Sequence, residues 1–266
     1  MNIIVCVKQV PDTLEVSVDK QTNTLIREGV ESVINPFDLY AVEEAMRLRE
    51  QHGGTVTVLS MGPSQVVDTL RDALSMGVEK GILLCDVGFA GADTLATSYT
   101  LATAIKKIGI FDLIICGRQA VDGDTAHVGP SLAEKLGIPH VSCVIKIHEV
   151  TDKYMVTGRM TEDGIEKVKL SLPGLITVSK GINEPRQPSL RGKITAARRD
   201  IEVWTAADIA ADSNKIGLKG SPTQVINMTT PEHHRAGQIL EGPVQQQVAD
   251  LVSTFSRAKI LQRSAK

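Results

Sequence analysis

Apolar and polar residues alternate along the first 150 residues in a pattern that predicts strands and helices in turn. Apolar-rich runs of the kind expected for strands buried on both faces lie at 3–7, 55–61, 82–85, 113–116 and 141–147. Between them apolar residues recur at helical spacing, with helices expected to begin near Asn35 and to cover about 93–108. Because strands that alternate with helices form parallel sheets, the pattern predicts an α/β fold with a doubly wound parallel sheet.

The pattern changes after about residue 150. Short strand-like runs separated by turn residues predict an extension of antiparallel hairpins, with strands at 154–159, 165–170 and 175–179. Residues 183–235 show weak periodicity and several prolines and glycines, which indicates an extended arm.

A last helix is expected from about Pro243 to Leu261. It carries an apolar face that consists of Val248, Leu251, Val252 and Phe255. Such a face, without an evident partner in the chain, usually marks an interface. The chain is therefore expected to divide into a sheet domain with its hairpin extension at 1–182 and an arm with a C-terminal helix at 183–266.

Composition narrows the class of protein. The chain has 266 residues, 42% of them hydrophobic, and a formal net charge of −2. With a pI near 6.3 it has no charge excess that would favour nucleic acid or an anionic membrane as its main partner. No apolar run approaches the roughly 20 residues that span a bilayer, and the N-terminus lacks the features of a signal peptide. A cytoplasmic protein without membrane insertion is expected.

The cysteines and histidines give little indication of a metal site. The four cysteines, Cys6, Cys85, Cys116 and Cys143, are far apart and form no C-x-x-C pair. Each lies in or beside an apolar run, where a free thiol behaves as a small buried hydrophobe, as suits a reducing compartment. We expect no metal.

The segment 117–130 is the strongest candidate site. It follows the apolar run 113–116, contains glycine and aspartate, and precedes a helix, so its backbone N–H groups could meet a phosphate. It is neither a Walker loop nor a Gly-x-Gly-x-x-Gly motif. In doubly wound sheets, ligands bind outside the carboxyl ends of strands where the strand order reverses. The alternative is an ordinary loop of turn residues.

Each residue type in this segment has a possible role. Asp122 and Asp124 could accept hydrogen bonds from nucleotide hydroxyls, while Gly123 and Thr125 could offer N–H groups to a pyrophosphate. Turn chemistry is the alternative for all of these. Val128-Gly129-Pro130 would open the next helix, whose dipole favours anions.

Residues outside this segment could also contribute. Asn35 is interpreted first as a helix cap and second as an adenine or ribose contact, with Asp38 supporting the cap. Lys8 and Arg118 could neutralise phosphate or remain surface charges. No nucleophile elbow or catalytic triad is present, so we assign no catalytic residue, and any chemistry would belong to a bound cofactor.

Four motifs resemble one protein family. Gly117-Arg118-Gln119-Ala120-Val121-Asp122-Gly123-Asp124-Thr125-Ala126-His127-Val128-Gly129-Pro130 is similar to the nucleotide loop of the electron-transfer flavoprotein β subunit. The segments that resemble other parts of that family are 5–11, 35–45 and 183–186. The resemblance implies a Rossmann-like doubly wound sheet whose first and fourth strands are neighbours at the switch point. It also implies a heterodimer with an α subunit, on which residues 183–266 would pack.

The family contains two classes that differ in this loop. In many members the loop carries three consecutive aspartates and the pocket holds a structural AMP. In electron-bifurcating members the loop resembles Asp-Gly-Asp-Thr-Ala-x-Val-Gly-Pro, and the pocket holds FAD that takes hydride from NADH. Gly123 places this chain with the second class, because a glycine removes bulk and charge. His127 departs from the glutamine usual there, and Arg118 stands where many relatives carry lysine.

The resemblance implies a function and a set of partners. FAD would accept hydride from NADH, and its electrons would pass to ferredoxin and, through the α subunit, to a flavin dehydrogenase of the acyl-CoA or hydroxy-acid type. The alternative is a non-bifurcating β subunit with AMP, an assembly and docking module. The cofactor-binding residues expected are Cys6, Val7, Lys8, Asn35, Asp38, Met61, Gly62, Gly117, Arg118, Gln119, Asp122, Gly123, Asp124, Thr125, Val128, Gly129 and Pro130.

A second site is expected where the family's partner-recognition loop begins. It comprises Ile182, Asn183, Glu184, Pro185 and Arg186. Pro185 would stiffen the loop, and Ile182 would be an exposed apolar anchor with a polar rim. The alternative is a surface turn with Ile182 packed beneath it. The basic residues at 191, 193, 198 and 199 could extend this docking surface or form a solvated face.

Overall fold

The computed structural model describes residues 1–12, 18–19, 24–25, 32–226, 237 and 239–260. The chain divides into a main unit, Met1–Met228, and a C-terminal unit, Thr229–Lys266. No helix in the described ranges is long and apolar enough to cross a membrane.

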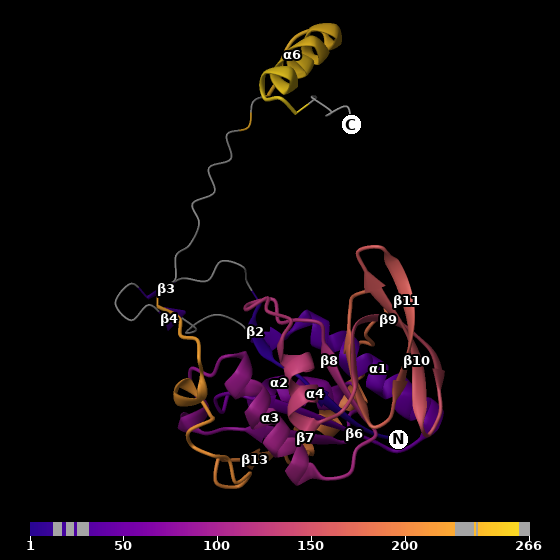
Figure 1. The fold of residues 1–266 in the computed structure, drawn as a ribbon, viewed down its shortest axis with the longest axis vertical. Helices are drawn as coiled ribbons and strands as arrows, with labels where there is room; N and C mark the ends of the chain where they lie inside the picture. Colours follow the sequence, from indigo (N-terminus) through magenta and orange to yellow (C-terminus); the bar gives the residue numbers. More distant parts are fainter. Residues whose placement is uncertain (13–17, 20–23, 26–31, 227–236, 238, 261–266) are drawn as a thin grey trace. The chain divides into compact units, whose positions relative to one another are not determined.

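A nine-stranded sheet forms the centre of the main unit (Figure 1). Its strand order is β11-β10-β9-β12-β8-β1-β6-β7-β13. The parallel part of the sheet consists of β1 (Asn2–Cys6), β6 (Thr55–Met61), β7 (Lys80–Leu84), β8 (Leu113–Gly117), β12 (Gly174–Val178), β13 (Glu202–Trp204) and β9 (His140–Val150), which is parallel to β12 and antiparallel to β10. The antiparallel extension consists of β10 (Tyr154–Thr161) and β11 (Gly164–Ser171).

Short two-stranded ribbons lie outside the large sheet. One pairs β2 (Gln9–Pro11) with β5 (Ser32–Ile34), and the other pairs β3 (Val18–Asp19) with β4 (Thr24–Leu25). The first ribbon places the chain that leaves β1 directly beside the chain that enters the first helix.

Helices cover both faces of the parallel region. On one face α1 (Pro36–His52) and α2 (Val66–Ser75) pack with α5 (Leu190–Arg198), which lies against α2. On the other face α3 (Thr94–Ile108) packs with α4 (Val128–Leu136). Two single turns of 3₁₀ helix, η1 (Val87–Phe89) and η2 (Leu218–Gly220), lie on the same face of the sheet as α3. The Asp93 side chain caps α3 by accepting hydrogen bonds from Leu95 N and Ala96 N.

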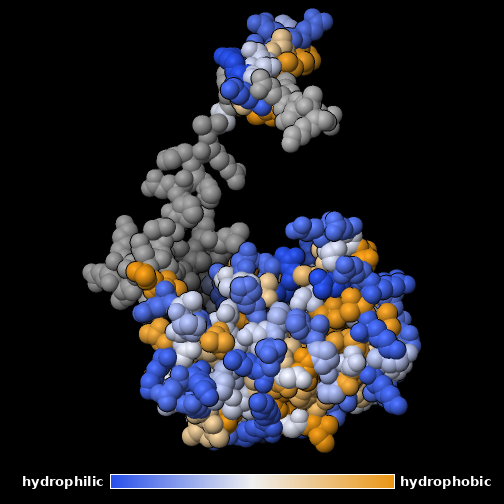
Figure 2. Space-filling view, viewed as in Figure 1, coloured by the Kyte–Doolittle hydropathy of each residue, from blue (hydrophilic) through white to orange (hydrophobic). Residues whose placement is uncertain are grey.

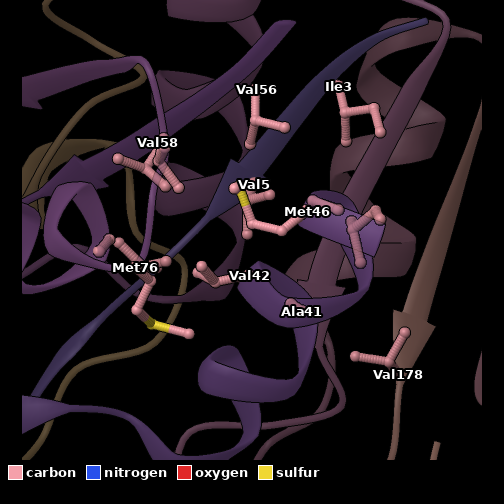
Figure 3. Close-up of a cluster of buried hydrophobic side chains, with 14 of the residues drawn as sticks. Ile3, Val5, Ala41, Val42, Met46, Val56, Val58, Met76 and Val178 are labelled. Atoms are coloured by element: carbon pink, nitrogen blue, oxygen red, sulfur yellow. The ribbon is translucent and has the colours of Figure 1, made fainter. Parts of the chain in front are cut away.

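Strand side chains alternate between two core clusters. In β1, Ile3 and Val5 face the α1 side whereas Ile4 and Cys6 face the α3 side. Figure 3 shows Ile3, Val5, Val42 and Met46 in the first cluster, where strand and helix side chains meet. Burial on both faces explains why the parallel strands read as continuous apolar runs.

The structure confirms the doubly wound α/β fold and the neighbouring positions of β1 and β8. It corrects the prediction for 175–179, which was assigned to an antiparallel hairpin. That segment, β12, inserts parallel between β8 and β9. All five residues of β12 are buried, so its short apolar run is that of an interior strand.

The structure also corrects the expected boundary at residue 182. Residues 183–226 belong to the main unit and contribute α5 and the edge strand β13. Hydrogen bonds join this segment to the core: Arg199 Nη1 donates to the carbonyl oxygens of Val78 and Glu79, both at 2.7 Å. Arg71 Nη1 donates to Ala196 O at 3.0 Å. The acceptors are main-chain carbonyl oxygens, which every residue type has. The hydrophobic periodicity of the sequence therefore could not indicate these hydrogen bonds.

The C-terminal unit contains the expected last helix, α6 (Val244–Arg257). None of its residues is buried. Figure 2 shows apolar surface on this unit among hydrophilic side chains. The exposed apolar residues of α6 are Val244, Val248, Leu251, Val252 and Phe255.

Candidate functional site

The candidate site is built around the carboxyl ends of β1 and β8. The two strands are parallel neighbours, with Cys6 opposite Cys116. β1 leads through α1 to β6 on one side, and β8 leads through α4 to β9 on the other, so the chain direction across the sheet reverses here. This is the switch point at which open α/β sheets bind ligands. At the end of β6, Met61 and Gly62 are half-buried.

The strand-end residues offer mainly backbone to this edge. Cys6 and Val7 are buried, and their side chains belong to opposite core clusters. Cys116 contacts Cys6, and this contact together with burial raises the pKa of the Cys116 thiol well above its usual range. The Cys116 thiol is therefore a neutral, packed group.

Asn35 ties the loop after β8 to the start of α1. Its Nδ2 donates to Gln119 O at 2.9 Å, and its Oδ1 accepts from Val121 N at 3.1 Å. The side chain makes no cap hydrogen bond to α1, so the cap interpretation was wrong for the side chain. The backbone carbonyl of Asn35 accepts from Asp38 N and Leu39 N and opens the helix. The amide instead supports the loop from below.

Lys8 and Asp122 pair with each other across the site. Lys8 Nζ lies 2.7 and 2.8 Å from the two carboxylate oxygens of Asp122. The pair links the end of β1 to the loop after β8. Because both side chains are partly exposed, the pair contributes at most about 1 kcal/mol to stability. Each group was expected to face a nucleotide, and a ligand would have to share or displace this contact.

The loop is held in shape by its own side chains. Arg118 Nε donates to Gln119 Oε1 at 2.7 Å, and Gln119 Nε2 hydrogen-bonds Asp124 Oδ1. The Arg118 guanidinium also lies 5.3 Å from the Phe37 ring centre. These contacts fix Arg118 beside the site instead of leaving it as a free surface charge.

Two residues of the loop adopt left-handed backbone conformations. Asp124 has φ 50° and Ala126 has φ 57°. Aspartate tolerates this region, whereas alanine does so at a cost of about 1 kcal/mol or more. Backbone strain of this kind concentrates at binding sites, where it shapes a surface before the ligand arrives.

Nothing within the chain requires a glycine at position 123, between Asp122 and Asp124. Gly123 has no positive φ, and a Cβ built on it would meet nothing within 4 Å. Gly129, by contrast, is required by packing, because its Cβ would lie 2.5 Å from Thr177 Cγ2. The same holds for Gly62, whose Cβ would lie 2.7 Å from Val66 Cγ2. The space that a side chain at position 123 would occupy is therefore open.

The remaining loop residues lie toward α4. Thr125 and His127 are exposed, while Val128 and Pro130 are half-buried in the first turn of the helix. The first N–H groups of an α-helix have no partner within the helix, and they attract anions. The His127 side chain makes no cap hydrogen bond there.

Asp38 is buried beneath the site. Its Oδ2 accepts from Lys8 N at 2.7 Å, so it does not support the helix cap as expected. Gly117 approaches it so closely that a Cβ would lie 2.2 Å from Asp38 Oδ1. Burial raises the pKa of Asp38 to about 7, although hydrogen bonds from Asn35, Lys8 and Gly117 act in the opposite direction.

The expected docking segment is packed against α1. Ile182 is half-buried and contacts the first core cluster, so the expectation of an exposed anchor there is wrong. Asn183 is buried, and its Nδ2 donates to Tyr40 O at 3.0 Å and to Glu44 Oε2 at 2.8 Å. Glu184 is exposed and Pro185 half-buried between these anchored residues.

Arg186 completes this attachment. Its Nε lies 2.8 Å from Glu43 Oε2 and its Nη1 lies 2.6 Å from Glu50 Oε1. Burial raises the pKa of Glu43, but the hydrogen bonds from Arg186 and Arg47 outweigh it and hold that pKa below its usual range.

The exposed apolar residues of this region lie a few positions further on. Leu190 is 77% exposed and Ile194 is 49% exposed, one turn apart on α5. Arg191 and Lys193 are exposed beside them. Sequence reasoning missed α5, although Ser189 is a typical N-cap residue that could have indicated it. Its Oγ accepts a hydrogen bond from Gly192 N at 3.0 Å and caps the helix.

Among the described residues, no group of three or more His, Cys, Asp or Glu is arranged to hold a metal ion.

Comparison with known proteins matches residues 22–209 to the electron transfer flavoprotein domain. An electron transfer flavoprotein subunit beta of Thermoanaerobacterium thermosaccharolyticum is 49% identical over 98% of this chain and 100% of its own length. The caffeyl-CoA reductase-Etf complex subunit CarD of Acetobacterium woodii is 43% identical over 98% of this chain and 100% of its own length. Protein FixA of Azorhizobium caulinodans is 45% identical over 87% of this chain and 85% of its own length.

Proposed function

The chain belongs to the electron transfer flavoprotein family, as a β subunit, and we propose that it binds FAD at the switch between β1 and β8 and takes part in electron bifurcation. Bound there, FAD would supply hydride acceptance from NADH and the delivery of the two electrons to different acceptors. The chain is thus the NADH-oxidising subunit of a cytoplasmic oxidoreductase complex.

The open space at Gly123 is the observation that supports FAD most directly. Nothing in the chain requires glycine at this position, because the backbone has no positive φ and a side chain would meet no atom within 4 Å. A requirement for a small uncharged residue would therefore come from the ligand. A ring system larger than a nucleotide base and bearing a hydride-accepting face would need this room.

The surrounding residues fit a dinucleotide cofactor. Strand-end backbone at Val7 and Gly117 forms the floor, and the loop after β8 is supported from below by Asn35. The first turn of α4 faces the loop with its dipole favouring a pyrophosphate. FAD supplies hydride acceptance and one-electron transfer when bound, whereas the chain binds, orients and shields it.

The relatives support an assembly with other proteins. The Acetobacterium woodii relative is described as a subunit of a caffeyl-CoA reductase-Etf complex. We propose that this chain pairs with an electron-transfer flavoprotein α subunit, and that the pair serves a flavin dehydrogenase of the acyl-CoA or hydroxy-acid type together with ferredoxin.

The dehydrogenase contact is assigned to the segment that begins at Ile182. Residues 182–186 anchor the segment on α1, and the exposed pair Leu190 and Ile194 would make the contact. An apolar anchor with a charged rim is the usual anatomy of such a contact.

The second candidate is a β subunit that holds AMP and has no redox role of its own. The loop after β8 and the first turn of α4 would bind a single phosphate as well as a pyrophosphate. Here Gly123 would be unrelated to the ligand, and the chain would act in assembly and docking.

Ligand identity decides between these candidates. The heterodimer is purified, denatured with acid, and the released nucleotides are separated and quantified by absorbance and mass. Two FAD per heterodimer are expected. One FAD and one AMP in equal amounts would contradict the FAD assignment and support the second candidate.

A further inference from the structure

The carboxyl group of Asp38 lies between the two strand ends that form the floor of the site. It belongs to the first turn of α1 and is 6% exposed. On the β1 side its Oδ2 accepts from Lys8 N at 2.7 Å. On the β8 side Gly117 leaves so little room that a Cβ would lie 2.2 Å from Oδ1 and 2.7 Å from Phe37 C.

We propose that Asp38 is a positioning residue that sets the spacing of the loops after β1 and β8 and takes up a proton when an anionic nucleotide binds above them. The proposal rests on the nucleotide site proposed above and concerns a group that does not itself touch the ligand. The position of the Asp38 carboxyl depends on Gly117, because only a glycine at position 117 leaves room for it.

The groups around Asp38 leave its charge poorly compensated. Lys8 is the cation that faces it, but the Lys8 ammonium is bound by both oxygens of Asp122. From β8, Cys116 faces it as a neutral thiol in contact with Cys6 of β1. From α1 itself, the Asn35 amide is the polar neighbour.

Burial therefore dominates the titration of Asp38. It raises the pKa to about 7, although hydrogen bonds from Asn35, Lys8 and Gly117 oppose it. Near neutral pH the group is divided between a neutral and a charged form. A ligand phosphate close to the strand ends repels the charged form, so binding raises this pKa further and draws a proton from solvent.

The sign of the resulting pH dependence follows from linkage. Below the pKa of the free site the carboxyl is already neutral, and binding requires no proton. As pH rises through that pKa, each binding event must protonate the group, so affinity falls. A further rise of about half to one unit on binding corresponds to an affinity about three- to tenfold weaker at the high-pH limit.

The test uses FAD as the probe and the heterodimer from which the nucleotide of this chain has been removed. Affinity is measured by isothermal titration calorimetry from about pH 6 to about pH 8.5, a range that brackets the Asp38 transition. Proton uptake is measured near pH 7.5 in two buffers with different ionisation enthalpies. The diphosphate of FAD keeps its charge over this range, so a change reports on the protein.

Three proteins are compared. The parent should bind about three- to tenfold more weakly at the upper pH limit and take up part of a proton. Asp38→Asn keeps an acceptor for Lys8 N but cannot ionise, and it should show neither effect. Glu44→Gln is the matched control: it removes another buried carboxyl of α1, one that binds Asn183 and faces away from the loop, and it should behave as the parent.

Equal affinity at all pH values in the parent, or the same pH dependence in Asp38→Asn, would overturn the proposal. If Asp38→Asn does not fold, proton uptake by the parent decides, since a purely structural role predicts none. Failure of FAD to bind at any pH would instead contradict the proposed flavin site. The titration with ADP would then test Asp38 separately, and absence of proton uptake with ADP would overturn it.

Discussion

Residues in and beside the loop after β8 differ in what they do for its structure: some hold the loop in shape, whereas Gly123 leaves open space. The Asn35 side chain hydrogen-bonds the loop backbone, and Arg118 hydrogen-bonds Gln119. These contacts give the loop its shape. Gly117 and Gly129 are required because any side chain would overlap neighbouring atoms. Gly123 alone among these glycines faces open space, and its effect should appear in binding and not in folding.

Replacing Gly123 with aspartate should weaken FAD binding by about tenfold and change thermal stability little. The added carboxylate would crowd the flavin and repel phosphate, and about 1.4 kcal/mol of repulsion corresponds to that factor. Flavin stoichiometry and the midpoint of thermal unfolding of the heterodimer measure the two effects.

Gly117→Ala is the comparison variant for this experiment. Its Cβ would meet Asp38 and the Phe37 backbone, so we expect a loss of about 1–3 kcal/mol in unfolding free energy. If Gly123→Asp retained full flavin content, or if it lost as much stability as Gly117→Ala, the ligand-based interpretation of Gly123 would fail.

At the scale of elements, α1 joins the two functional regions. Its N-cap residue Asn35 and its first-turn residue Asp38 lie beside the candidate nucleotide loop. Its later turns hold the segment after β12 through Glu43 and Glu44. α5 follows that segment and presents Leu190 and Ile194 outward. The helix thus supports both the candidate cofactor site and the candidate docking surface.

Leu190→Ala should slow electron transfer to the dehydrogenase and leave NADH reduction of the bound flavin nearly unchanged. Truncating an exposed apolar anchor removes interface area, and the expected loss is about 1–2 kcal/mol, or about five- to thirtyfold in the affinity for the dehydrogenase. Steady-state transfer as a function of dehydrogenase concentration and stopped-flow reduction by NADH separate the two steps.

Ile182→Ala is the matched control. Because Ile182 packs on the first core cluster, its truncation should lower the stability of the main unit instead of the affinity for the dehydrogenase. A Leu190 variant that slowed both steps alike, or neither, would show that α5 is not the docking element.

At the scale of the whole molecule, the C-terminal unit carries an apolar helix face of its own. Its helix α6 has no buried residue, and its apolar side chains are spaced along one helix. We expect this helix to pack on the α subunit, because an exposed apolar face of this kind normally serves as an interface.

Truncation before Pro243 should abolish co-purification with the α subunit while the main unit keeps its fold. The reason is that the nine-stranded sheet and both core clusters lie within Met1–Met228. Co-expression with a tagged α subunit measures complex yield, and circular dichroism of the truncated chain measures folding. Heterodimer yield equal to that of the full chain would assign the interface elsewhere.

The sequence by itself determined the main strands and helices of the first 150 residues and their order, because burial on both faces leaves continuous apolar runs in parallel strands and a helical period between them. It also singled out the candidate nucleotide loop, because the residues of that loop are consecutive and their sequence resembles one family. The adjacent positions of β1 and β8 followed from the same resemblance.

Tertiary structure alone decided contacts between residues far apart in the chain. β12 lies between β8 and β9 and is parallel to both. The short spacing of the runs after residue 150 is equally compatible with a hairpin, so it does not indicate this placement. The pairing of Lys8 with Asp122, the use of Asn35 to hold a loop, and the burial of Asp38 against Gly117 are equally non-local. Periodicity reports which face a residue occupies, whereas its partner is set by the packing of elements brought together from distant parts of the chain.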